Sequence, residues 1–173
     1  MENKIITTKI EIYSYNELSE VDKNLVERAK KATETSYAPY SKFNVGAAVL
    51  LANGEIISGS NQENVAYPSG TCAERTTIFY ASAKFPGVRF EKLAIAAFTN
   101  GEFVEEPISP CGACRQVILE YEKLGGQPIE ILLAGRDKVY KLEGIRALLP
   151  LSFEEFKKNK KEAVPCDTAS YVL

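Results

Sequence analysis

The chain has 173 residues, an apolar share of 45% and a net charge of −2, and it contains no histidine. This length can bury the core of one domain, and the near-neutral charge offers no basic surface for the phosphate backbone of a nucleic acid. No segment is apolar over the length of a membrane span, and residues 1–12 lack the pattern of a signal peptide. Four cysteines fit a reducing compartment, so we expect a cytoplasmic protein without a membrane partner.

The first helical pattern lies in the N-terminal part of the chain. An amphipathic helix is predicted over residues 18–35. Its apolar stripe consists of Leu18, Val21, Leu25, Ala29 and Ala32. Residues 6–13 alternate weakly between apolar and polar side chains, so they form either an extra edge strand or a partly ordered arm. Residues 36–41, which include Pro39, predict a loop that leads to Phe43.

A β-hairpin follows this loop. Residues 45–52 form the continuous apolar run of a buried strand, and Asn53-Gly54 is a strong turn signal that returns residues 55–60 antiparallel. Asn61 and Glu63 come next, two residues apart, so their side chains share one face and could bracket a diol. The alternative is that residues 61–64 are an ordinary polar loop.

The first of two cysteine stretches is Thr71-Cys72-Ala73-Glu74-Arg75. Residues 73–84 contain neither Gly nor Pro, and Ala73, Thr77 and Ala81 recur at helical spacing, which predicts a helix. Thr71 is expected to cap its N-terminus through the side-chain hydroxyl.

The second cysteine stretch is Ser109-Pro110-Cys111-Gly112-Ala113-Cys114. Pro110 suits the first position of a helix, because an N–H there has no intrahelical partner. The apolar stripe of this helix consists of Val117, Ile118, Tyr121 and Leu124, and Gly125-Gly126 is expected to end it. Cys111 and Cys114 are three residues apart and should therefore share one helix face.

The remaining patterns continue an alternation of strands and helices. Strands are predicted over residues 93–99, 129–134 and 139–142, with turns at 100–101 and 135–137. Residues 144–149 predict a short helix, 153–162 a charged helix, and 163–173, with Cys166, an irregular end. Alternating strands and helices predict parallel pairing and helices on both faces of the sheet.

The two cysteine stretches together predict a catalytic zinc site. Thiolates from Cys72, Cys111 and Cys114 would close most of a tetrahedron and leave the fourth position to water, whose pKa a metal lowers from about 15.7 toward 7. Glu74 beside this cage is placed to move protons, although an isolated glutamate here would be a solvated helix charge. Two helix N-termini would offset part of the negative charge that three thiolates bring to one ion.

Arg75 and Arg115 are each adjacent to a zinc ligand in the sequence, so each could donate to sulfur and offset more of that charge. A structural zinc or a redox pair is the alternative to a catalytic site. A structural site normally has four ligands, however, and the only other thiol, Cys166, lies far downstream.

Several motifs together resemble those of a known enzyme family. They are Tyr40-Ser41-Lys42-Phe43-Asn44-Val45-Gly46-Ala47-Ala48, Asn61-Gln62-Glu63-Asn64, Tyr67-Pro68, Cys72-Ala73-Glu74-Arg75 and Pro110-Cys111-Gly112-Ala113-Cys114-Arg115-Gln116. This combination is similar to the small, homotetrameric, zinc-dependent cytidine deaminases that act on free nucleosides. The likeness covers residues 18–153.

The resemblance implies a fold and an assembly. The fold is an α/β, three-layer α/β/α sandwich with a mixed five-stranded sheet. We expect one domain over residues 1–173 with its core at about 18–153, and a peripheral N-terminal arm and C-terminal tail. A homotetramer is implied, with Tyr67 and Phe153 as candidates for subunit contacts.

The resemblance also implies the roles of individual residues. Cys72, Cys111 and Cys114 would bind one Zn²⁺ per subunit. Glu74 would pass a proton from water to ring N3 and then to the leaving amine, converting cytidine or deoxycytidine to uridine or deoxyuridine with release of ammonia, a step of pyrimidine salvage. Substrate contacts are implied for Phe43, Asn61, Glu63, and the backbone of Ala73 and Ser109. Without the family, Phe43 would more simply be a core residue.

Two other functions stay open from the sequence. One is deamination of a different aminopyrimidine, such as the nucleoside antibiotic blasticidin, on the same zinc cage. Asn61 and Glu63 favour a plain ribose over this substrate. The other is a zinc domain without catalytic activity that serves as a binding module.

Overall fold

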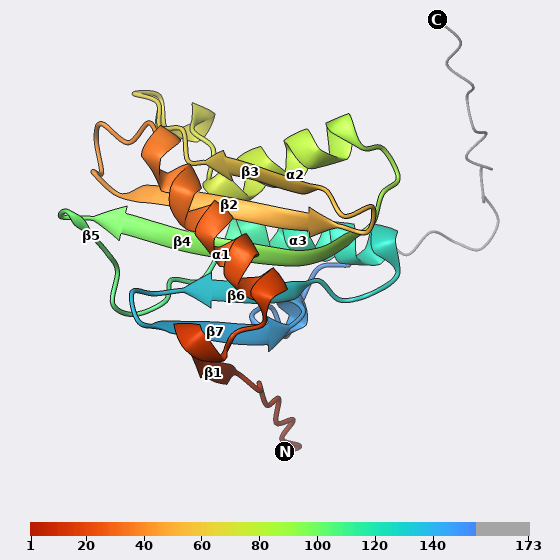
Figure 1. Ribbon diagram of the computed structural model, residues 1–173. Helices are drawn as coiled ribbons and strands as arrows, with labels where there is room; N and C mark the ends of the chain where they lie inside the picture. Colours follow the sequence, from red (N-terminus) through yellow and green to blue (C-terminus); the bar gives the residue numbers. More distant parts are fainter. Residues whose placement is uncertain (155–173) are drawn as a thin grey trace, which may run out of the picture.

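A computed structural model describes residues 1–154 of the chain as one mixed β-sheet with helices on both faces (Figure 1). The strands are β1 (Glu11–Ser14), β2 (Asn44–Leu51), β3 (Ile56–Ser60), β4 (Phe90–Thr99), β5 (Glu102–Phe103), β6 (Glu130–Ala134) and β7 (Lys138–Glu143). The helices are α1 (Glu20–Ala32), α2 (Ala73–Lys84) and α3 (Gly112–Gly125), with single 3-10 turns η1 (Tyr15–Glu17), η2 (Thr33–Thr35), η3 (Tyr67–Ser69) and η4 (Ile145–Ala147).

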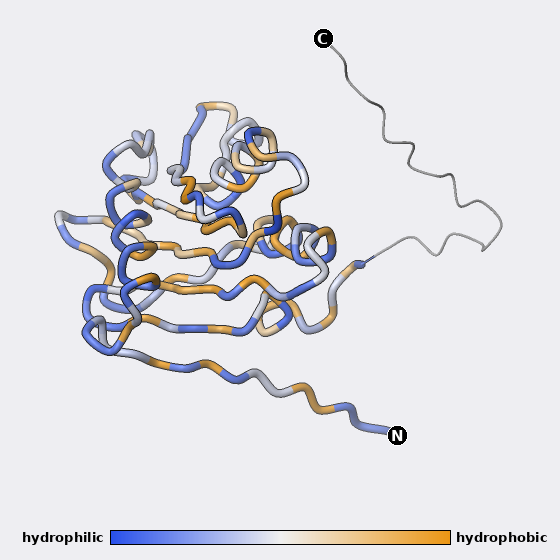
Figure 2. The backbone as a smooth tube through the Cα atoms, turned by 45° about the vertical axis from the view of Figure 1, so that its right-hand side comes forward, coloured by the Kyte–Doolittle hydropathy of each residue, from blue (hydrophilic) through white to orange (hydrophobic). Residues whose placement is uncertain are grey.

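The three-layer α/β/α prediction is confirmed. Helix α1 crosses one face of the sheet, while α2 and α3 cover the other (Figure 1). Hydrophobic residues concentrate along the strands between these layers, and the connections are more hydrophilic (Figure 2). One buried cluster joins β2, β4 and β6 to α2 and α3, and a second joins the same strands to α1. The sheet therefore has no solvent-facing side over its centre.

The strand count differs from the five that were predicted. The sheet contains seven strands in the order β1-β7-β6-β4-β2-β3, with β5 paired to β4. The additional strands are β5, whose two residues are too few to form a pattern, and β1, which settles the open alternative for the N-terminal segment in favour of an edge strand. Residues 11–14 pair antiparallel with β7.

Parallel pairing is also rarer than predicted. Only β4 and β6 pair in parallel among the described strands, and α3 connects them. Strands β3 and β4 run in the same direction across the α2 connection, but β2 lies between them and pairs antiparallel with both. The alternation of strands and helices thus correctly predicted that β3 and β4 run in the same direction. It did not predict that they are not neighbours, because the hairpin places β2 between them.

Ser19 is the N-cap of helix α1. Its side chain accepts a hydrogen bond from Asp22 N at 3.2 Å and so satisfies one free N–H of the first turn. The predicted stripe is partly wrong: Val21 is 51% exposed, whereas Val26 is fully buried. The buried side of the helix consists of Asp22, Leu25, Val26, Ala29 and Ala32.

Helix α1 lies unusually close to β2 at Gly46. A Cβ atom at Gly46 would stand 2.1 Å from Ala29 O and 2.7 Å from Thr33 N. Only a residue without a side chain fits this contact. The absence of a side chain in the strand therefore sets the depth of the helix over the sheet.

A partly buried group of four charges connects α1 to three strands. Asp22 on α1 accepts hydrogen bonds from Lys92 on β4 at 2.6 Å and from Lys141 on β7 at 3.4 Å. Glu130 on β6 pairs with the same two lysines. Charges alternate in sign around the group, so each has opposite charges as neighbours.

The two cysteine helices occur where they were predicted, with corrections at their starts. Helix α2 has the predicted bounds, but its N-cap is Cys72 and not Thr71. Helix α3 starts at Gly112 with Cys111 as N-cap, so Pro110 precedes the helix and does not occupy its first position. A cysteine thus occupies the N-cap position of each helix, and neither side chain makes a capping hydrogen bond.

The far end of α3 stops as expected. Gly126 follows it in the left-handed conformation, with φ of 69°. The predicted apolar stripe is wrong at Leu124, which is 73% exposed. Leu119 and the carboxylate of Glu122 are buried in its place, and Glu122 accepts from Ile129 N and Ile145 N.

The C-terminal part of the described chain is irregular. The short helix predicted at 144–149 is the single 3-10 turn η4. Most of the predicted charged helix at 153–162, and the end at 163–173 with Cys166, lie outside the described residues. Within residues 1–154, no helix combines the length and hydrophobicity needed to cross a membrane.

Candidate active site

Three cysteines from distant parts of the chain meet at one end of the sheet. Cys72 Sγ lies 3.7 Å from Cys111 Sγ, and Cys111 Sγ lies 3.5 Å from Cys114 Sγ. All three sulfurs are within 4.8 Å of one another, and no other group of candidate metal ligands of this size occurs among residues 1–154. The predicted convergence of Cys72, Cys111 and Cys114 is therefore present.

Two helix starts produce this convergence. Cys72 is the N-cap of α2, Cys111 is the N-cap of α3, and Cys114 lies in the first turn of α3. Unpaired N–H groups at both helix ends supply partial positive charge to the sulfurs. Gln62 aligns the first cysteine loop with the end of β3, because its backbone exchanges two hydrogen bonds of 2.9 Å with Thr71.

The sulfur geometry fits a zinc ion. Tetrahedral zinc with bonds of about 2.3 Å to sulfur places thiolates about 3.8 Å apart, close to the separations seen here. The cage is closed on one side only, since Cys114 is buried, Cys72 is half-buried and Cys111 is exposed. Three thiolates with an open side are the donor set of a catalytic zinc site, because a structural site usually has a fourth protein ligand.

The groups around Cys72 favour the thiolate form of this one cysteine. A hydrogen bond from Cys114 and a further one from Arg75 lower the pKa of Cys72 to about 5, against the opposing effect of its burial. The same hydrogen bond with Cys72 raises the pKa of the Cys114 thiol. One thiolate is thus stabilised within the group, and a divalent cation would replace the protons that the others retain.

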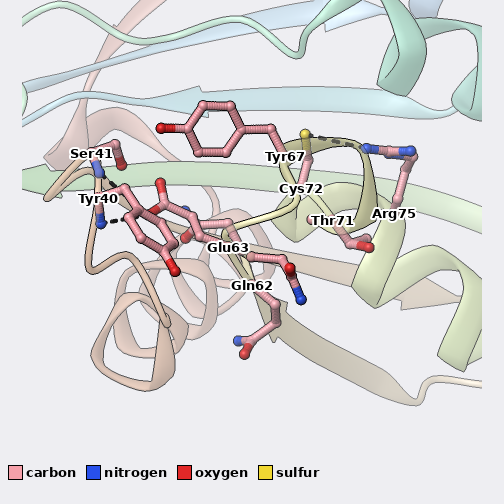
Figure 3. A pocket seen from close by; sticks show the side chains of 11 residues that line it. Tyr40, Ser41, Gln62, Glu63, Tyr67, Thr71, Cys72 and Arg75 are labelled. Carbon is pink, nitrogen blue, oxygen red and sulfur yellow. Dashed lines mark hydrogen bonds between the residues drawn. The ribbon is translucent and has the colours of Figure 1, made fainter.

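Arg75 contacts the cage as predicted. Its Nη2 lies 3.8 Å from Cys72 Sγ (Figure 3). The guanidinium Nε is buried and is the one buried side-chain nitrogen or oxygen without a hydrogen-bond partner within residues 1–154. A cation held next to sulfur in this way offsets negative charge where the three thiolates gather.

Arg115 has different contacts from those predicted. Its guanidinium donates to Pro110 O at 2.7 Å, Leu148 O at 2.8 Å and Ser109 Oγ at 2.9 Å. These bonds join the loop that carries Cys111 to the segment after η4. Arg115 thus braces the backbone around the cage, and its hydrogen bonds go to oxygen atoms.

Glu74 is the carboxylate nearest to the cage in the sequence, and it is only 4% exposed. Burial raises its pKa, and the charge of Cys72 raises it further. A carboxyl group whose proton affinity is shifted toward neutrality can both accept and return a proton. This is the behaviour that the predicted role of Glu74 requires.

A cavity of about 510 Å³ opens beside Cys72 (Figure 3). Its lining consists of Tyr40, Ser41, Asn61, Gln62, Glu63, Asn64, Tyr67, Gly70, Thr71, Cys72 and Arg75. Polar groups from two loops and one strand end thus surround a space large enough for a small molecule. Tyr40 and Tyr67 pack edge to face with ring centroids 6.1 Å apart, on either side of Glu63 (Figure 3).

Glu63 is held by the loop that faces it. One carboxylate oxygen accepts hydrogen bonds from Tyr40 N at 2.9 Å and Ser41 N at 3.2 Å. Hydrogen bonding by Ser41 and Tyr40 lowers the pKa of Glu63. The carboxylate is therefore ionised and acts as an acceptor at the cavity wall. The sequence did not indicate these two backbone donors, since a loop sequence does not reveal where its N–H groups point.

Asn61 is engaged by the protein on both ends of its amide. Its Oδ1 accepts from Ser36 Oγ at 2.5 Å and Val45 N at 2.7 Å, and its Nδ2 donates to Phe43 O at 2.9 Å. Among the residues that the structure describes, Nδ2 makes no second hydrogen bond, so Asn61 can offer a single donor to a molecule in the cavity. Residues 61–64 lie in a polar loop, and within that loop the Asn61 side chain has defined partners.

The other predicted substrate contacts lie outside the cavity lining. Phe43 is half-buried and Ala73 is buried under the start of α2. Ser109 is exposed and receives a hydrogen bond from Arg115. The candidates for subunit contacts, Tyr67 and Phe153, are 76% and 61% exposed.

Comparison with known proteins decides the family. Residues 19–124, more than half of the chain, match the family described as the cytidine and deoxycytidylate deaminase zinc-binding region. The chain belongs to this family. The matched range contains Cys72, Cys111, Cys114 and Glu74. The predicted membership of a zinc-dependent hydrolytic cytidine deaminase family is confirmed, and the three-cysteine group fits one zinc ion as the cofactor.

Individual family members show how far the similarity extends. A cytidine deaminase of Sporosarcina psychrophila is 53% identical over 98 residues, which span 56% of this chain and 67% of the relative. A crystal structure of cytidine deaminase from Burkholderia pseudomallei aligns with a TM-score of 0.63 and 39% identity, over 79% of this chain and all of that one. The enzyme from Mycobacterium tuberculosis aligns with a TM-score of 0.61 and 33% identity, over 78% and 98% of the two chains.

Proposed function

We propose that this deaminase hydrolyses cytidine and deoxycytidine to uridine and deoxyuridine with release of ammonia, as a step of pyrimidine salvage. The observation that carries the proposal is the three-sulfur cage with one open side, next to a cavity of about 510 Å³. Relatives that cover most of this chain's fold are named cytidine deaminases. We further propose that residues 1–173 form one domain with its core at 18–153.

Cys72, Cys111 and Cys114 would hold the zinc ion. When bound, zinc acts as a Lewis acid that lowers the pKa of a coordinated water molecule to near neutrality. Partial positive charge from α2 and α3 and the guanidinium of Arg75 reduce the excess negative charge of the three thiolates. Arg115 keeps the loop before Cys111 in position through its three backbone and hydroxyl contacts.

Glu74 would carry the protons of the reaction. Its carboxylate accepts a proton from the attacking water and delivers it to N3 of the pyrimidine as the oxygen adds to C4. It then takes the second proton of that oxygen and gives it to the exocyclic nitrogen, which leaves as ammonia. Burial of Glu74 suits this cycle, since a carboxyl with a raised pKa gains and loses a proton readily.

The sugar and base contacts complete the proposed site. Asn61 would donate to a sugar hydroxyl, and Glu63 would accept from one through the oxygen that does not bind Tyr40 and Ser41. Phe43 would pack against the pyrimidine, and the backbone of Ala73 and Ser109 would bind its polar edge. These three contacts require movement or completion of the site, because the cavity lining does not include them.

A homotetramer would supply such completion. Tyr67, which lines the cavity, and Phe153 are exposed aromatic residues, and we propose that they contact neighbouring subunits. We also propose that the protein is cytoplasmic. Sedimentation of the zinc-loaded protein at working concentration should give a mass four times that of the chain. A fully active monomer would contradict both contact assignments.

A substrate panel tests the proposed function. Cytidine, deoxycytidine, CMP and blasticidin are each mixed with the zinc-loaded protein, and loss of pyrimidine absorbance and release of ammonia are followed. We expect turnover of the two free nucleosides, because Glu63 is anionic and would repel a phosphate placed near the sugar. Preferential turnover of blasticidin would contradict the proposal, and loss of activity on all four would favour a binding module.

A further inference from the structure

We propose that Ser36 is a positioning residue for the sugar subsite, which acts together with Val45 N and Phe43 O to hold the Asn61 amide in one orientation. The proposal rests on the proposed function, because it concerns how the chain reads the hydroxyls of a nucleoside. Ser36 follows η2, and its Oγ lies 2.5 Å from Asn61 Oδ1, within the range of a strong O–H···O bond.

The contacts leave only one orientation for the Asn61 amide. Val45 N–H can only donate, so the amide atom 2.7 Å from it must be oxygen. Phe43 C=O can only accept, so the amide atom 2.9 Å from it must be nitrogen. Ser36 then donates to the oxygen. The remaining N–H of Asn61 is thereby defined as a donor.

This orientation gives the cavity wall a defined hydrogen-bonding polarity. Asn61 presents a donor, whereas Glu63 presents an ionised oxygen that only accepts. A sugar hydroxyl can accept from the first and donate to the second. A flipped Asn61 would place a second acceptor beside Glu63, and the pair would then bind hydroxyls poorly.

Ser36 does not line the cavity beside Cys72. It lines a separate cavity of about 490 Å³ on the α1 side, with Asn44 and Phe98. Asn61 thus separates Ser36 from the nucleoside cavity. The direct contact between the Ser36 hydroxyl and the cavity wall is therefore its hydrogen bond to Asn61.

The backbone around Ser36 is held independently of its hydroxyl. Ser36 N donates to Thr33 O at 3.2 Å, and Tyr37 N donates to Asn61 O at 3.1 Å. Thr35 Oγ1 and Ser60 Oγ lie 2.9 Å apart and join the same two segments. Removal of the Ser36 hydroxyl should therefore leave the segment in place and remove one of the three hydrogen bonds that hold the Asn61 side-chain amide.

The test compares substrates that have or lack the sugar hydroxyls. Ser36→Ala should raise KM for cytidine about fivefold, the effect of one lost hydrogen bond, while kcat changes less than about twofold. The preference for cytidine over 2′,3′-dideoxycytidine, as a ratio of kcat/KM, should fall by the same factor. Ser36→Thr restores the hydroxyl and should restore the ratio. Ser58→Ala, which removes an exposed hydroxyl from β3, is the matched control and should keep the ratio of the parent.

Equal losses on both nucleosides would overturn the proposal, because they would show a general structural effect of Ser36→Ala. An unchanged preference would overturn it as well. A binding measurement separates this result from a failure of the proposed function. Calorimetric binding of uridine and 2′,3′-dideoxyuridine to the zinc-loaded protein should show the same fivefold loss of preference, about 1 kcal/mol, even in a protein that does not turn over cytidine.

Discussion

At the level of single residues, Arg75 shows how one side chain can stabilise a group of cysteines by donating a hydrogen bond to sulfur. Its Nη2 faces Cys72 Sγ at 3.8 Å, and within residues 1–154 its buried Nε has no hydrogen-bond partner. Positive charge beside sulfur stabilises a thiolate, so this half-buried guanidinium supports the cysteine cage. Arg115 is also adjacent to a cysteine in the sequence, but within residues 1–154 its guanidinium donates hydrogen bonds to oxygen atoms only.

Arg75→Ala should weaken zinc binding about 10- to 100-fold, as expected for loss of a partner that supports a ligand. The measurement is zinc retention in competition with a chelator, read as metal per chain. Arg89→Ala is the matched control, because Arg89 is exposed and pairs with Glu91 away from the cage. Equal retention in the two variants would show that the Arg75 contact does not support the thiolates.

At the scale of elements, the close approach of α1 to β2 depends on one missing side chain. Ala29 O and Thr33 N occupy the space where a Cβ of residue 46 would lie. The carbonyl belongs to helix backbone and cannot rotate away. The whole helix would have to move, and with it η2 and Ser36, which lead into the cavity wall.

Gly46→Ala should lower the free energy of unfolding by about 3 kcal/mol, the upper part of the range for overpacking. Denaturant unfolding of the zinc-loaded protein measures this. Gly112→Ala is the control, because a Cβ there meets no atom within 4 Å. Its free energy of unfolding should be unchanged or slightly higher than that of the parent. A fully stable Gly46→Ala protein would contradict the proposed depth of α1.

At the scale of the whole molecule, the four-charge group connects α1 to β4, β6 and β7 and makes stability depend on pH. Burial raises the pKa of Asp22, but hydrogen bonds from Lys92 and Ser19 outweigh that effect and hold it below its ordinary value. Folding therefore favours the ionised form. The resulting stabilisation is complete above the unfolded pKa, about 3.9, and is lost as pH falls through the lower folded pKa.

Asp22→Asn should destabilise the fold by about 2 kcal/mol at pH 7, since it leaves Lys92 and Lys141 with less opposite charge. The difference from the parent should shrink as pH falls below about 4. Urea unfolding at both pH values tests this. Glu20→Gln on the exposed side of α1 is the control, with an expected effect below about 0.5 kcal/mol. A constant Asp22→Asn difference across this range would contradict the pH argument.

Much of the fold could be predicted from local patterns, because the hairpin at Asn53-Gly54, the bounds of α2 and the end of α3 at Gly126 depend on nearby residues. Periodicity identified helices but placed their faces inexactly: Val21 and Leu124 are exposed. The pairing of β2 with β4 could not be predicted, since strand order depends on how distant segments pack.

The zinc cage could be predicted because spacing and chemistry restrict three cysteines strongly. The hydrogen bonds of Asn61 could not, since they depend on Ser36, Phe43 and Val45 meeting at one side chain. The contacts of Arg115 are similar, because they need the backbone of Leu148 beside α3. Sequence thus identified the three cysteines that meet, but the structure was needed to see which residues support them.

The proposed role of Glu74 is to carry the protons of a zinc-dependent deamination of cytidine. The most direct measurement follows absorbance loss on addition of cytidine for the parent and for Glu74→Gln, with zinc per chain determined in both. We predict about one zinc per chain in each protein and a loss of kcat of about 10³-fold in the variant, the usual scale for a lost general acid–base group. Turnover by zinc-loaded Glu74→Gln at the parent rate would rule out this role of Glu74.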